Sequence, residues 1–67
     1  MNIVSSTKLR SNLAVTLGKV KKEKYRLISV RGKVKFGVLD FEYLKNLLKG
    51  VNEKMLIELE KAQREFE

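Results

Sequence analysis

The chain has 67 residues and a net charge of +7, from fifteen Lys and Arg against eight Asp and Glu. Because it contains no Cys and no His, disulfides, zinc sites built on these residues, thiol chemistry and imidazole catalysis are excluded, and a reducing cytoplasm is the expected location. No apolar run approaches the roughly 20 residues of a membrane span, and the N-terminus lacks a signal-peptide pattern. A chain of this size buries only about 60% of the surface that its unfolded form exposes, so a monomeric core is expected to be marginal.

The charge is divided unevenly along the chain. Residues 1–50 hold twelve basic against three acidic side chains, a net charge of +9, whereas residues 51–67 have a net charge of −2. This asymmetry predicts a basic body that binds a polyanion and a mildly acidic tail that binds a cationic partner. The alternative is that the lysines serve only to keep a small protein well solvated.

The N-terminal part predicts a short strand followed by a helix. Asn2–Val4 is β-prone, and the next three residues are all candidate helix N-caps. An apolar series with helical spacing then predicts one helix from about Thr7 to about Lys21, with a face formed by Leu9, Leu13, Ala14, Leu17 and Val20. Gly18 is expected to fray this helix or to mark close packing. Lys8 and Arg10 lie where the helix dipole prefers acids, either by chance or because a phosphate or base edge docks there.

The segment Tyr25–Asp40 predicts a β-hairpin. A two-residue Gly32-Lys33 loop suits a primed turn. In that register Arg31 faces Val34, and the remaining predicted pairs are Ser29 with Phe36, Ile28 with Gly37 and Leu27 with Val38. Both faces of the hairpin are then apolar and must be covered, which in so short a chain indicates a partner.

Two short helices are predicted after the hairpin. Asp40 is expected to cap the first, and Gly50 to end it in a left-handed conformation. Asn52 is expected to cap the second, whose apolar stripe consists of Met55, Leu56, Leu59, Ala62 and Phe66. An isolated helix of about 15 residues is marginal in water, so it either packs on the body or awaits a partner's groove.

The sequence carries no recognisable enzyme signature. Gly18-Lys19 and Gly32-Lys33 lack the other residues of a phosphate-binding loop, and helix capping accounts for Asp40 and Glu42. The serines and threonines have no histidine to activate them. We therefore expect a protein that is not an enzyme and that needs no metal or cofactor.

The order of the motifs resembles that of the Phd/YefM family of type II toxin–antitoxin antitoxins. The resemblance covers residues 1 to about 48 and depends on I-V-S-S-T-K-L-R-S-N-L, L-x-x-V, L-I-S-V-R-G-K-V-K-F-G-V-L and D-F-E-Y-L, in that order. It implies an α+β fold with a β-α-β-β-α body that dimerises through its sheet. It divides the chain into a DNA-binding and dimerisation domain, residues 1–50, and a C-terminal helical toxin-binding segment, residues 51–67.

The resemblance also implies partners and site residues. The dimer is expected to bind double-stranded operator DNA and repress its own operon, through Ser5, Thr7, Lys8, Arg10, Asn12, Arg31 and Lys33. Arg10 is expected to contact a guanine edge, and Lys8 and Lys33 to contact phosphates. The tail is expected to neutralise a cognate toxin, RelE-like rather than Doc-like, through Met55, Leu56, Leu59, Ala62 and Phe66. Two alternatives remain: a dimeric DNA-binding regulator without a toxin partner, and an interaction adaptor whose charge serves solubility.

Overall fold

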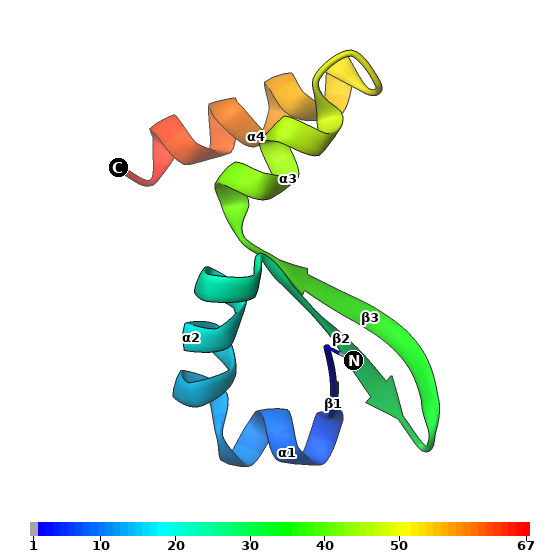
Figure 1. Cartoon of the computed structure of the whole chain (residues 1–67). Helices are drawn as coiled ribbons and strands as arrows, with labels where there is room; N and C mark the ends of the chain where they lie inside the picture. The colour runs from blue at the N-terminus through cyan, green and yellow to red at the C-terminus, as the bar shows by residue number, and fades with distance from the viewer. Residues whose placement is uncertain (1) are drawn as a thin grey trace.

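The computed structural model describes residues 2–67, which form a small α+β structure with a three-stranded mixed sheet and four helices (Figure 1). The elements follow the order β-α-α-β-β-α-α. Their bounds are β1 Ile3–Ser5, α1 Ser6–Ser11, α2 Leu13–Glu23, β2 Tyr25–Val30, β3 Lys33–Leu39, α3 Phe41–Leu48 and α4 Glu53–Glu65. The predicted strand, helix, hairpin and two terminal helices are therefore all present, with one helix more than expected.

The sheet has the order β1-β2-β3. β1 pairs in parallel with β2, with Val4 opposite Ile28 and Ser5 opposite Ser29. The N-terminal segment is therefore an edge strand, as predicted. A parallel pair needs a crossover connection, which here is the α1–α2 segment, and α2 packs against β2 (Figure 1).

The turn of the hairpin lies one residue earlier than the sequence predicts. Val30 pairs with Lys33, so the two loop residues are Arg31 and Gly32, and not Gly32 and Lys33. Both have positive φ angles, 52° and 78°, as a type I′ hairpin turn requires. Only Gly32 adopts such a backbone without strain, and the sequence prediction was wrong because it did not allow a non-glycine residue at the first position.

A register irregularity between Ile28 and Ser29 further changes the predicted pairing. Ser29 lies opposite Val34 but Ile28 lies opposite Phe36, so Lys35 is the extra residue of a β-bulge. Beyond the bulge Leu27 faces Gly37 and Tyr25 faces Leu39. The predicted pairs would place Phe36 and Val38 on the same face as Leu27. In the structure they share the α2 side of the sheet with Ile28, and Leu39 lies on the opposite side with Leu27.

The first helical segment is broken at Asn12, where the sequence predicted a continuous helix. Asn12 has φ −132° and ψ 46°; it closes α1 through its N–H, and its carbonyl accepts the Thr16 N–H at 3.0 Å. The predicted weak point, Gly18, lies within continuous α2 in open space. Within α2 the buried residues are Thr16 and Val20, four apart, while Leu13 and Leu17 of the predicted core face are exposed. The buried face of α2 is therefore rotated from the predicted one.

The core of the described chain is small. Its buried apolar residues are Val4, Val20, Ile28 and Leu56, and no large side chain is completely buried. By contrast, twelve large apolar side chains are exposed, and Leu13, Leu17, Leu39 and Leu47 are among them. Such a chain buries too little apolar surface to be very stable by itself, and extensive apolar exposure is typical of interaction surfaces.

The last two helices form a hairpin of their own. Asp40 caps α3 by accepting the Tyr43 N–H at 3.1 Å, and Asn52 caps α4 by accepting the Met55 N–H at 3.0 Å, both as predicted. Gly50 has φ 75° in the connection, which confirms the predicted left-handed residue. Leu56 is only 7% exposed, in contact with α3.

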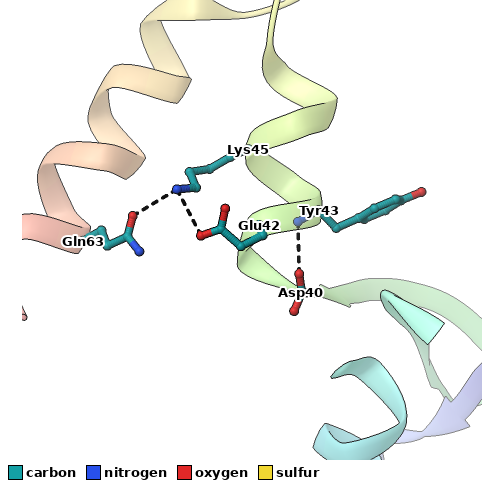
Figure 2. A network of polar contacts seen from close by, with 5 residues as sticks. All are labelled: Asp40, Glu42, Tyr43, Lys45 and Gln63. Atoms are coloured by element: carbon teal, nitrogen blue, oxygen red, sulfur yellow. Dashed lines mark hydrogen bonds and ion pairs between the residues drawn. The ribbon is translucent and has the colours of Figure 1, made fainter. Parts of the chain in front are cut away.

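Polar contacts also join α3 to α4. Figure 2 shows the Nζ of Lys45 between Glu42 of its own helix and Gln63 of α4, at 3.2 Å from an oxygen of each. The same ammonium lies 5.3 Å from the centre of the Phe41 ring, within the range of a cation–π contact. Residues 51–67 thus contact α3, which is one of the two arrangements that the sequence leaves open for this segment.

Candidate nucleic-acid and protein interfaces

The sheet register brings the two groups of predicted DNA-binding residues to the same end of the molecule. Ser5, which ends β1 and precedes α1, lies opposite Ser29, two residues before Arg31. The chain therefore leaves the sheet into α1 at the end where the β2–β3 turn lies (Figure 1). Lys8 and Arg10 of α1 and Arg31 and Lys33 of the turn are all exposed. We call these four residues the basic end.

The start of α1 is held by a side-chain cap. The Ser5 hydroxyl accepts the Lys8 N–H at 3.1 Å, and the Ser11 hydroxyl donates to the Lys8 carbonyl at 3.1 Å. Ser5 therefore has a structural role in addition to its predicted place in the interface. Thr7 is exposed on α1, and Asn12 occupies the break between α1 and α2.

Arg31 combines an unfavourable backbone with an exposed charge. Its φ of 52° lies in the left-handed region, which costs a residue with a β-carbon about 1–2 kcal/mol and favours Gly, Asn or Asp. An arginine is an expensive choice for this turn unless its guanidinium has another use. The strained backbone therefore indicates a functional role for Arg31 independently of the sequence resemblance, which implies that Arg31 contacts DNA.

An apolar groove lies on the sheet face opposite α2. It has a volume of about 370 Å³ and is lined by residues of β2, β3 and α3, namely Tyr25, Arg26, Leu27, Gly37, Val38, Leu39, Tyr43 and Leu47. Arg26 is the one charged residue of this lining. Gly37 has no side chain there, and a β-carbon added to it would meet Leu27 at 3.7 Å and Leu39 at 3.9 Å. We call this surface the open sheet face.

A second apolar groove lies between α3 and the end of α4. It has a volume of about 350 Å³ and is lined by Phe41, Ala62, Gln63, Phe66 and Glu67. Phe66 is 91% exposed. The predicted toxin-binding stripe is thereby divided: Leu56 is buried and Leu59 is half-buried, whereas Met55, Ala62 and Phe66 are exposed.

Sequence reasoning missed two basic residues that the fold places near the α1–α2 break. Lys19 of α2 and Arg26 of β2 both approach Lys8 and Asn12 around a small cleft. Sequence patterns give Lys19 no specific role and place Arg26 only within the predicted hairpin. Helical spacing could have separated Lys19 from Lys21, since two residues differ by about 200° around a helix, but Arg26 could be placed only with the strand register.

Within residues 2–67 no group of three or more Asp and Glu side chains is arranged to hold a metal ion. The helices of the same residues are too short or too polar for any of them to cross a membrane.

Comparison of the chain with protein-family models, with curated proteins and with solved structures found no match in any of the three searches. The functional interpretation therefore depends on the chain's own residues and on the resemblance of its motif order.

Proposed function

We propose that this protein is the antitoxin of a type II toxin–antitoxin system, which binds operator DNA as a homodimer and neutralises a cognate toxin through its C-terminal part. The single observation that carries the proposal is that α1 and the β2–β3 turn lie at the same end of the sheet (Figure 1). Lys8, Arg10, Arg31 and Lys33 are all exposed at this end. The order of motifs that resembles Phd/YefM antitoxins is the second support.

The homodimer is proposed to form through the open sheet face. Four buried apolar residues are a small core for a chain of this length, and a second copy would remove the apolar groove from water and raise the apparent stability of both. A two-fold interface uses the same patch on both subunits. It would also duplicate the basic end, so the operator is expected to be palindromic.

In the proposed complex with DNA, Arg10 reads a guanine edge while Lys8, Lys33 and Arg31 contact phosphates. A guanidinium can donate two parallel hydrogen bonds to the O6 and N7 atoms of guanine, whereas lysines act chiefly as point charges on the backbone. The protein is proposed to need no cofactor and to perform no catalysis.

The toxin is proposed to bind the exposed apolar residues of α4 and the acidic side chains around them. Ala62 and Phe66 border a groove, and the charge of residues 51–67 complements a basic partner such as a RelE-like RNA-cleaving toxin. The direct test is co-expression with the neighbouring small basic gene product. Co-purification and rescue of growth are expected; a neighbour that neither binds nor is neutralised would contradict the antitoxin assignment.

A second candidate function is a DNA-binding regulator without a toxin. It is favoured by one observation, the burial of Leu56 together with the contact between α3 and α4, which gives α4 a structural role within the chain. Deleting residues 52–67 separates the two functions. Under the second function the deletion should weaken the dimer, whereas under the first it should leave operator binding intact and abolish binding of the toxin.

Replacing Arg10 by Ala is expected to weaken operator binding by about 1–3 kcal/mol, roughly 5- to 150-fold, because a bidentate base contact is lost. Binding can be measured by fluorescence anisotropy at several salt concentrations, since phosphate contacts make the affinity depend steeply on salt. Lys21→Ala removes an exposed cation of α2 outside the basic end and is the matched control. Equal losses of operator affinity in the two variants would show that Arg10 contributes only its positive charge and no specific base contact.

Replacing Arg31 by Asn is expected to stabilise the fold by up to about 1 kcal/mol, because Asn-Gly is the preferred pair in a type I′ turn. The same substitution should weaken operator binding by removing a phosphate contact, so stability and function should change in opposite directions. Urea unfolding and DNA titration of one preparation measure both. A variant that is more stable than the parent and binds DNA with the same affinity would show that Arg31 does not contact DNA.

A further inference from the structure

A cleft lies between β1 and the α1–α2 crossover, beside the basic end. Its volume is about 90 Å³, and its polar lining consists of Lys8, Asn12, Thr16, Lys19 and Arg26. Since roughly 10–15 Å³ of such volume holds one water, the cleft has room for several waters or for one group the size of a phosphate. The sequence predicted Lys8 and Asn12 as interface residues but did not associate Thr16, Lys19 or Arg26 with them.

Three separate elements direct cations to this cleft: Lys8 comes from α1, Lys19 from α2 and Arg26 from β2. No carboxylate of the described residues lines it. The nearest acid that pairs with the lining is Glu23, whose carboxylate lies 2.9 Å from a terminal nitrogen of Arg26. Three cations against one carboxylate leave an excess positive charge, which favours an anion.

Arg26 is held firmly in place and is not fully satisfied. Its side chain is 12% exposed, and its Nε is buried without a hydrogen-bond partner among residues 2–67. A guanidinium has five N–H donors, and the ion pair with Glu23 uses one terminal nitrogen. The buried Nε cannot itself reach a ligand in the cleft, but an anion beside the terminal nitrogens would add a second charge-assisted contact to the one that Glu23 makes.

The N-terminus of α2 adds to the positive potential of the cleft. Asn12 is the N-cap residue, but its side chain makes no capping hydrogen bond, and the first turn of this 11-residue helix contains no acid. Asn12 and Thr16, from the cap and the second turn, both line the cleft. The N-terminus of α2 therefore borders the same space as the three cationic residues, although the C-terminus of α1, whose C-cap is also Asn12, partly offsets its dipole.

We propose that this cleft binds one tetrahedral oxyanion of the phosphate type, with Lys19 and Arg26 as its main cationic ligands and Lys8 at its mouth. Two sources supply this chemistry, a phosphodiester of the DNA backbone or a free phosphate group. The DNA source rests on the proposed function, because Lys8 and Asn12 also belong to the proposed DNA interface. The free-anion source is independent of that function.

Titration of the full chain with inorganic phosphate, against chloride at equal ionic strength, tests the site by following backbone amide signals in NMR spectra. Saturable shifts of Asn12 and Thr16 are expected, and Lys19→Ala should weaken the binding roughly three- to tenfold, as expected for the loss of one charge-assisted contact. Lys21→Ala is the matched control, because Lys21 lies on the same helix, is exposed and is absent from the cleft lining. Shifts that are spread over all lysines, or equal losses in both variants, would overturn the proposal.

A short random-sequence duplex, added to the phosphate-bound protein, separates the two sources. If a DNA phosphate is the ligand, the duplex should displace inorganic phosphate from the cleft and shift the same amide signals. Lys19→Ala should then weaken the binding of inorganic phosphate and of the duplex alike. If the ligand is a free anion, phosphate binding should persist in the presence of the duplex. Failure of operator binding together with intact phosphate binding would contradict the proposed function while leaving the anion site standing.

Discussion

A Leu39→Glu variant is expected to be a monomer at concentrations where the parent chain is a dimer. Leu39 lies on the open sheet face beside Leu27 and is 37% exposed in the single chain, so in one copy its replacement can still reach water. In the proposed dimer the new carboxylate would be buried, and the one basic residue of the groove, Arg26, is already paired with Glu23, so the substitution costs several kcal/mol. The dimer should weaken by at least about 100-fold, the equivalent of about 2.7 kcal/mol.

Sedimentation over a range of protein concentrations measures the change directly, against a monomer mass of 7.8 kDa. Ile57→Glu is the matched control, because Ile57 is 62% exposed on α4 and does not line the open sheet face. The control should remain a dimer. Operator affinity should fall when the dimer is lost, because binding through two linked half-sites raises the affinity by about 10²- to 10⁴-fold. A parent chain that stays monomeric, or a Leu39→Glu dimer of unchanged stability, would exclude the open sheet face as the interface.

Local capping signals predicted the ends of the terminal helices well. Asp40 and Asn52 each cap the helix that follows them, and Gly50 takes the left-handed conformation between the two helices. These features depend on side chains that hydrogen-bond to backbone groups three residues away. Such interactions are decided within a few residues, so the sequence is sufficient to predict them.

Features that depend on competing local conformations were predicted less well. The break at Asn12 had no clear signal, because an asparagine is tolerated in a helix and is also a good N-cap. Gly18, which was expected to fray the helix or to mark close packing, lies within the continuous helix α2. At the hairpin, Arg31 adopts a conformation that propensity disfavours, and this shifted the turn and the register of both strands.

The candidate interfaces were predicted as sets of residues but not as surfaces. Placing Lys8 and Arg10 at the same end of the sheet as Arg31 requires the parallel register of β1 on β2, which joins residues far apart in the chain. The cleft around Lys19 and Arg26 requires the same register and the crossover helices. Long-range pairing decides such placements, and a single sequence contains little direct information about it.

A Leu56→Ala variant is expected to release α4 from α3. Leu56 is the most deeply buried residue of the helical hairpin, and truncation of a buried leucine costs about 2–5 kcal/mol. Since the other links are the Lys45–Gln63 hydrogen bond and partly exposed contacts, the loss should be comparable to the whole free energy that holds α4 in place. Hydrogen exchange of amides 53–65 should accelerate by at least about 30-fold, the equivalent of 2 kcal/mol, while amides of β2 change little.

The effect on toxin binding then distinguishes two roles for α4. If the toxin contacts only the exposed residues Met55, Ala62 and Phe66, docking on α3 preorganises the helix, and its release should weaken the complex. If the proposed toxin instead binds the buried residues of α4, the α3–α4 hairpin must open before the complex can form. A Lys45→Ala variant, which loosens this hairpin without changing α4, should then strengthen toxin binding. Met55→Ala is the matched control, since Met55 is exposed on the same helix and its truncation should leave hydrogen exchange unchanged. Protection of α4 that is equally low in the parent and in the Leu56→Ala chain would show that α4 is not docked in solution, and both roles would then be wrong.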